Sequence, residues 1–177
     1  MRISLIVSTL VFAGASLASS IAFSAEKIVT VHAISEAGIG KSIGTITFSD
    51  SNEGLVIKPN LSELTPGTHG FHIHEKPSCD AAEKDGKVVA GQAAGGHYDP
   101  AKSSKHEGPM GMGHKGDLPA LEVTTDNHAE KPMLAPNLKL SDIAGHAVII
   151  HEGGDNYSDT PKPLGGGGGR VACGIVD

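Results

Sequence analysis

The chain has 177 residues, a formal net charge of −6 and a charged fraction of 19%. This length suits one domain, the charge content excludes a disordered polyelectrolyte, and the acidic balance argues against binding to nucleic acid. Glycine is abundant, at 24 residues, and aromatic residues make up 3% of the chain, which favours short strands joined by many turns. Ten histidines, seven of them between His69 and His128, are the main indication of function.

Residues 1–24 are typical of a secretory signal peptide. Arg2 supplies a positive charge, an apolar run extends from about Ile3 to Ala18, and small residues lead to a cleavage point near Ser24 or Ala25. A membrane anchor is the alternative, but the run is short and interrupted by Ser and Gly. We therefore expect residues 25–177 to form an exported domain that has no membrane-spanning segment.

The mature chain contains alternating or β-branched segments that predict strands. These segments are 27–33, 44–49, 55–58, 68–75, 119–125, 147–151 and 170–176. Seven or eight short strands predict an all-β fold, either an antiparallel sandwich or a flattened barrel. Two long linkers, Lys76–Leu118 and Glu152–Gly169, begin beside histidines, and we interpret both as functional loops.

Cys79 and Cys173 are the two cysteines of the chain. In an oxidising compartment an isolated pair usually forms a disulfide. On the chain-entropy model such a bridge stabilises the fold by about 4–5 kcal/mol. Thiolate metal ligation is the weaker alternative, since neither cysteine has a second Cys or a His at ligand spacing.

His72 and His74 lie two residues apart on a predicted strand, so they share one face and can bind one metal ion. His69 has the opposite parity and is left out of this pair. His151 ends an apolar strand and is followed by glycines, which leave room for a ligand. His146, five residues earlier, faces the other side of that strand.

The first long loop contains further candidate ligands. Three imidazoles and one carboxylate, spaced nine, eight and three residues apart through Gly- and Pro-rich chain, match the preferences of tetrahedral Zn²⁺. They are His97, His106, His114 and Asp117. His32 and His128 have no ligand-like neighbours, and we expect both on the surface.

Six segments together resemble the copper/zinc superoxide dismutase family, and within it the exported bacterial branch. These segments are GFHIHE, GGHYDP, HEGP, HKGDLPAL, IIHEGGDNYSD and GGGGGRVACG. The resemblance spans nearly the whole mature chain and implies a Greek-key β-sandwich in the periplasm. It also implies an antioxidant enzyme that converts superoxide to O₂ and H₂O₂ by alternating reduction and oxidation of copper, beside a structural zinc.

The resemblance further implies one copper and one zinc ion per subunit. The copper ligands would be His72, His74, His97 and His151, and the zinc ligands would be His97, His106, His114 and Asp117. His97 would bridge both ions and accept a proton when copper is reduced, and Arg170 would attract superoxide. Asp155 would orient His72 and His106, and Cys79 and Cys173 occupy the disulfide positions of the family.

A net negative protein with an anionic substrate needs a local positive patch near copper. The candidate lysines in the two loops are Lys76, Lys84, Lys87, Lys105, Lys115 and Lys162. Superoxide is the expected partner, with no nucleic acid and no membrane after signal removal, and the sequence leaves monomer and homodimer both open. Two other functions remain as alternatives: a non-catalytic exported copper/zinc-binding protein and a zinc-only hydrolase.

Overall fold

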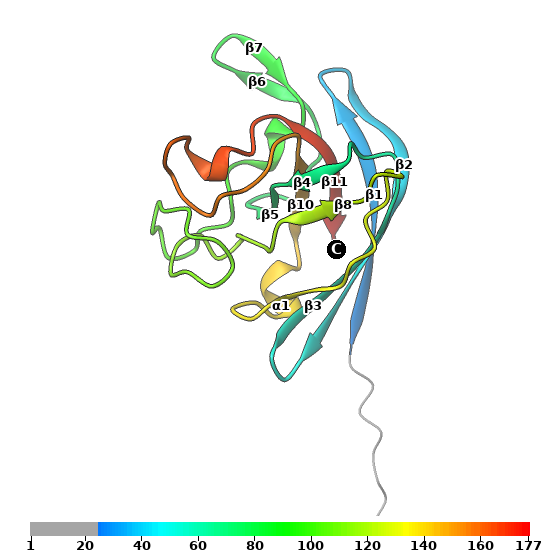
Figure 1. The fold of residues 1–177 in the computed structure, drawn as a ribbon. Helices are drawn as coiled ribbons and strands as arrows, with labels where there is room; N and C mark the ends of the chain where they lie inside the picture. The colour runs from blue at the N-terminus through cyan, green and yellow to red at the C-terminus, as the bar shows by residue number, and fades with distance from the viewer. Residues whose placement is uncertain (1–24) are drawn as a thin grey trace, which may run out of the picture.

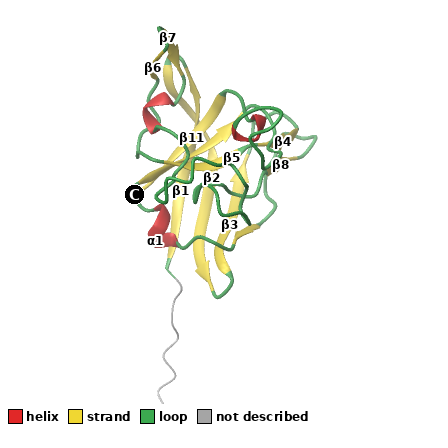
Figure 2. Ribbon diagram, turned by 90° about the vertical axis from the view of Figure 1, so that its left-hand side faces the viewer, coloured by secondary structure: helices red, strands yellow, loops and turns green. Residues whose placement is uncertain are grey.

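The computed structural model describes residues 25–177, so the predicted signal peptide lies outside the described residues. Strands predominate, with one short α-helix, α1 (Leu140–Ile143), and two 3₁₀ turns (Figure 2). No helix in this part of the chain is long and apolar enough to cross a membrane.

One curled antiparallel sheet of seven strands forms the body of the molecule, in the order β5-β10-β11-β1-β2-β3-β9 (Figure 1). Two small sheets, β4-β8 and β6-β7, complete the fold. The strands are β1 (Glu26–Ser35), β2 (Gly38–Ser51), β3 (Gly54–Leu61), β4 (Gly67–His69), β5 (Phe71–His74), β6 (Ala82–Lys84), β7 (Lys87–Val89), β8 (Leu121–Val123), β9 (Met133–Ala135), β10 (His146–His151) and β11 (Arg170–Val176). The prediction of an all-β antiparallel fold is confirmed.

Alternation along the strands separates the core from the surface. On β1, Val29 and Val31 are buried, whereas the side chain of Ile28, which points to the other face, is 61% exposed. The inner side chains of β1, β2, β3, β5 and β10 form one apolar cluster that includes Phe48 and Phe71. This rigid core supports the two long loops on one side of the sheet (Figure 1).

Two predictions about elements need correction. The predicted strand 68–75 is two strands, because the chain pairs with β8 up to His69 and with β10 from Phe71 onward. At the switch, Gly70 donates its N–H to the Gly153 carbonyl and accepts from the His151 N–H. The first long loop is not without structure, since it contains the β6-β7 hairpin, which projects from the body of the molecule (Figure 1).

The predicted disulfide is present between Cys79 and Cys173, whose Cα atoms lie 5.6 Å apart. Cys173 lies on β11 and Cys79 on the first long loop, so the bridge ties this loop to the large sheet. The closed segment spans 94 residues.

Candidate metal centre

Backbone pairing around β5 brings the predicted ligands together. The Ile73 N–H donates to Gly116 O and its carbonyl accepts from the Tyr98 N–H, both at 2.8 Å. Ile73 therefore fastens two distant parts of the first loop on either side of one strand residue. The result is that His74 pairs with His97, and His72 with Asp117.

The first group consists of four buried imidazoles whose ligand nitrogens lie within 4.8 Å of one another. They are His72, His74, His97 and His151. In each, one buried nitrogen has no hydrogen-bond partner: Nδ1 of His72 and Nε2 of the other three. For three of these rings the second nitrogen is fixed by donation: to Asp155 from His72, to Gly95 O from His74 and to Gly168 O from His151.

The second group adjoins the first. Ligand atoms of His72, His97, His106 and Asp117 also lie within 4.8 Å of one another. His114 lies beside this group, with Nδ1 3.5 Å from Asp117 Oδ1. The buried atoms without a hydrogen bond here are His106 Nδ1, His114 Nδ1 and Asp117 Oδ2, and the first and last of these form an ion-pair contact of 2.9 Å.

His97 faces both groups through its two ring nitrogens. Its Nδ1 donates to Asp117 Oδ1 at 3.0 Å, while Nε2 points toward the first group without a partner. Its ring is stacked on that of His72, with centroids 4.0 Å apart. One imidazole thus separates two neighbouring sets of ligand atoms.

Asp155, on the second long loop, connects a ring of each group. Its Oδ2 accepts from His72 Nε2 and its Oδ1 from His106 Nε2, both at 2.7 Å. The polyglycine run comes close to this carboxylate, because a Cβ on Gly165 would stand 2.0 Å from Asp155 Oδ1. A side chain at this position would therefore displace Asp155.

Arg170 begins β11 opposite His151. Its guanidinium donates to Gly91 O at 2.5 Å and to Gly95 O at 2.6 Å. Gly95 O also accepts from His74 Nδ1. The cation is therefore held in a fixed position beside a member of the first group.

Burial dominates the electrostatics of the first group. It lowers the pKa of His72, of His74 and of His151, and it lowers the pKa of His97 to about 4. These rings are therefore neutral at pH 7, which is the form that binds metal.

The carboxylates control the second group. Burial alone would lower the pKa of His106, but Asp117 and Asp155 outweigh it and raise that pKa to about 9. Burial would likewise raise the pKa of both carboxyl groups, but hydrogen bonds from the neighbouring histidines lower it well below the usual value. Without metal, His106 is thus a buried cation between two anions.

Two histidines outside the groups bond the backbone of group members. His69 is buried, and its ring nitrogens bond to His151 O and Thr65 O, both at 2.7 Å. His146 Nδ1 lies 3.1 Å from His74 O and 3.0 Å from Glu75 O. Parity correctly separates both from the ligand face, but their contacts with ligand backbones depend on the tertiary fold.

Three further expectations can be compared with the structure. His128 is exposed as predicted, whereas His32 is half-buried and bonds Gly40 O. Among the candidate lysines, Lys115 forms an ion pair with Asp142 at 2.7 Å, so its charge is already partnered. Lys162 lines a hollow together with Asp155 and Gly165, close to the second group.

The residues present fit a pair of metal ions. Within residues 25–177, the buried side-chain polar atoms without a hydrogen bond belong to the seven predicted ligands. An unsatisfied buried polar group costs about 1–3 kcal/mol, so this arrangement is stable when ions take up the free lone pairs. An antiparallel β fold with two adjacent histidine-rich groups defines the class of protein that could hold two neighbouring metal ions.

Comparison with known proteins identifies the family. The family model described as copper/zinc superoxide dismutase (SODC) matches residues 42–176. The chain is 50% identical to the Cu-Zn superoxide dismutase of Escherichia coli K12 over 176 residues, which cover 99% of this chain and 98% of the relative. It is 58% identical to that of Photobacterium leiognathi over 138 residues, 77% of this chain and 80% of the relative.

A solved structure gives the same result. The Cu/Zn superoxide dismutase from Brucella abortus matches with a TM-score of 0.85 and 49% identity, over 86% of this chain and 100% of the relative. The chain belongs to the copper/zinc superoxide dismutase family and is an enzyme of that class. The resemblance inferred from the six segments is confirmed.

Proposed function

We propose that this chain converts superoxide to O₂ and H₂O₂ at a copper ion, next to a structural zinc ion, with one of each per chain. The proposed copper ligands are His72, His74, His97 and His151. The proposed zinc ligands are His97, His106, His114 and Asp117.

The observation that carries the proposal is the set of seven buried ligand atoms without a hydrogen bond, which lie in two adjacent groups. The four-imidazole group suits Cu²⁺, which prefers tetragonal nitrogen coordination. The group that contains a carboxylate suits Zn²⁺. His97, with a nitrogen toward each group, is the bridging ligand.

His114 completes the zinc site in preference to His72. Both nitrogens of His72 are otherwise used, because Nε2 bonds Asp155 and Nδ1 belongs to the copper group. His114 Nδ1 has no hydrogen-bond partner and lies beside Asp117. A zinc ion bound beside Asp117 would give that nitrogen a partner.

Copper, when bound, supplies one-electron oxidation and reduction of superoxide. Arg170 holds a fixed positive charge beside the copper ligands and attracts the anion. His97 Nε2 takes up a proton when it is not ligated and returns it to the product. Asp155 keeps the rings of His72 and His106 in the tautomer that leaves Nδ1 free for metal.

We also propose that residues 1–24 are a signal peptide and that residues 25–177 act in the periplasm. The support comes from the charge and apolar pattern of the first residues and from the disulfide, which needs an oxidising compartment. N-terminal sequencing of protein recovered from a periplasmic fraction tests both points; Met1 at the mature terminus contradicts them.

The relative from Salmonella enterica is described as monomeric. This supports a monomer over the homodimer that the sequence leaves open. Sedimentation velocity at micromolar concentration decides between the two.

Superoxide decay tests the function. Mature protein loaded with copper and zinc should remove superoxide far faster than the metal-free protein or the zinc-only protein. A protein that binds both ions without faster decay is the non-catalytic metal-binding protein considered from the sequence. Superoxide decay that needs zinc alone contradicts the proposed centre. So does a His97→Ala variant that still binds both ions as well as the wild type.

A further inference from the structure

The second long loop is fastened onto the first at the zinc side. Asp159 Oδ2 accepts from the His106 N–H at 2.9 Å, and Asp159 Oδ1 accepts from the Leu164 N–H at 3.1 Å. Together with the bond from His106 Nε2 to Asp155, this holds both the ring and the backbone of His106. In Figure 1 the two loops lie side by side to the left of the sheet.

Tyr157 makes the outermost of these fastenings. Its hydroxyl oxygen accepts from the Ala120 N–H at 2.9 Å, on the chain that follows the zinc loop. Its ring lies against Gly108, where a Cβ would stand 2.7 Å from the ring carbons. Its own N–H donates to Asp155 Oδ1 at 2.8 Å, the same oxygen that accepts from His106.

The backbone at both contact points is adapted to this packing. Gly108 has φ 71° and Tyr157 has φ 56°, and both lie in the left-handed region. Gly108 supplies the free surface that the ring covers, two residues after His106. Tyr157 adopts the left-handed conformation although it is not a glycine, and the bond from its N–H to Asp155 holds its backbone there.

We propose that Tyr157 is a positioning residue that retains zinc by closing the second loop over the His106 side of the zinc site. The inference rests on the zinc ligands proposed above. The side chain of Tyr157 acts through the backbone at Gly108, two residues after His106, and at Ala120, three residues after Asp117, and it does not touch the metal.

The contacts predict a selective effect on one ion. The side chain of Tyr157 joins residues next to the zinc ligands, whereas the copper ligands His74 and His151 come from the large sheet, which this side chain does not contact in the bonds described. Zinc loss requires His106 to move away, so a looser loop shortens the lifetime of zinc. The copper lifetime changes much less.

The experiment uses the copper- and zinc-loaded protein in excess chelator, with the release of each ion followed separately. Tyr157→Phe keeps the ring and removes the hydroxyl, so zinc release accelerates about fivefold, the effect of one neutral hydrogen bond. Tyr157→Ala removes both contacts, and zinc release accelerates more than tenfold. Ile39→Ala is the control, since Ile39 is an exposed apolar side chain on β2, 50% exposed against 40% for Tyr157, and takes no part in the contacts described for the two loops.

Each outcome decides the inference. The inference is supported if zinc release is faster in Tyr157→Phe and faster still in Tyr157→Ala, while copper is retained and Ile39→Ala behaves like the wild type. Equal release of both ions indicates general loosening and overturns it, as does zinc release at the wild-type rate. If the wild-type protein binds no zinc, the proposed zinc site fails as well, and this result is distinct from zinc that binds and leaves at an unchanged rate.

Discussion

Replacement of Asp155 by asparagine should separate the two metal sites. Asp155 Oδ1 accepts two N–H groups, from His106 and from the Tyr157 backbone, while Oδ2 accepts one, from His72. The carbonyl oxygen of an asparagine will therefore occupy the Oδ1 position. Its NH₂ group will then face His72 Nε2, where two donors meet.

The magnitude follows from the bond that is lost. To relieve the conflict, His72 either loses its partner or moves its proton to Nδ1, the nitrogen proposed to bind copper. A hydrogen bond to a charged group contributes about 1.5–3 kcal/mol. The copper affinity should therefore fall by about 10- to 150-fold, in line with the effect of outer partners of metal ligands. The zinc affinity should fall less, because His106 keeps an acceptor.

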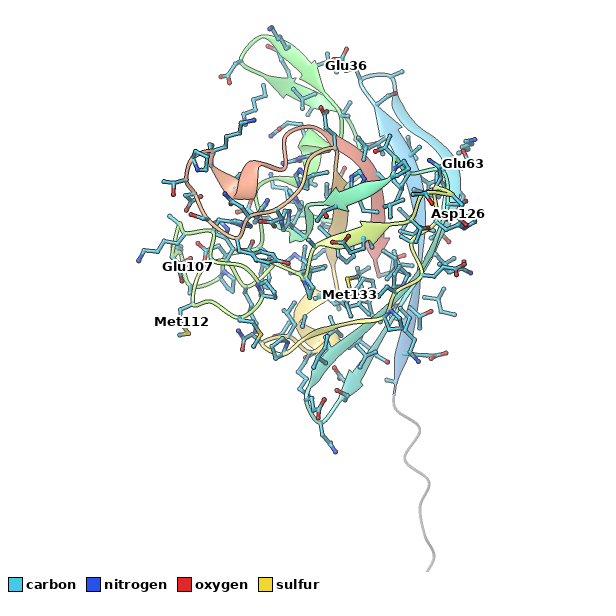
Figure 3. The ribbon with its side chains drawn as sticks, viewed as in Figure 1. Glu36, Glu63, Glu107, Met112, Asp126 and Met133 are labelled. Carbon is cyan, nitrogen blue, oxygen red and sulfur yellow. A yellow bond between two sulfur atoms is a disulfide. The ribbon has the colours of Figure 1, made fainter. Side chains whose placement is uncertain are left out.

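Competition with a chromophoric chelator measures both affinities. Asp155→Ala removes the acceptors of both His72 and His106 and should lower the affinity for both ions. Asp126→Asn is the control, because Asp126 lies on the opposite side of the molecule from the loop marked by Glu107 and Met112 (Figure 3). Unchanged affinities in both Asp155 variants would refute the orienting role, and a larger loss of zinc than of copper in Asp155→Asn would refute the assigned amide orientation.

Three further predictions follow from the site and the fold. In the metal-free protein, burial lowers the pKa of His106, but two carboxylates outweigh this effect and raise it to about 9, so zinc must displace a proton from His106 below that pH. The zinc affinity should therefore rise about tenfold per pH unit from pH 7 to 8. A zinc affinity that does not depend on pH contradicts this. Arg170→Glu should slow superoxide decay at least tenfold and make added salt accelerate it, since salt screens the new repulsion; an unaltered rate and salt dependence would show that Arg170 does not attract substrate. Cys79→Ser combined with Cys173→Ser should lower the free energy of unfolding by about 4–5 kcal/mol in urea titration, and a loss below about 1 kcal/mol would contradict the stabilising role of the bridge.

Strands with strong alternation were predictable from the sequence. The strand 170–176 matches β11 in both bounds, since its apolar and small residues follow directly after a polyglycine run. The β6-β7 hairpin escaped prediction because its strands are three residues long, although Asp85-Gly86 is a turn signal typical of a tight hairpin. The edge strand β9 is equally short.

Among the site residues, those defined by parity and family segments were predictable, and those defined by distant contacts were not. The pair His72 and His74 follows from strand geometry alone. The contact of Tyr157 with Ala120 and Gly108 joins residues 37 and 49 positions apart by number, and no local pattern indicates it. His69 could be excluded as a ligand, but its bond to His151 O required the fold.

The shared oxygen of Gly95 has a consequence for how this loop can vary. Because His74 Nδ1 and Arg170 Nη2 both donate to that one carbonyl, the spacing between the proposed copper ligand His74 and the guanidinium of Arg170 is set by a single backbone atom. The β6-β7 hairpin lies upstream of this reference point and projects away from it (Figure 1). Changes in the length or charge of the hairpin can therefore alter how anions approach from outside while the inner spacing stays constant.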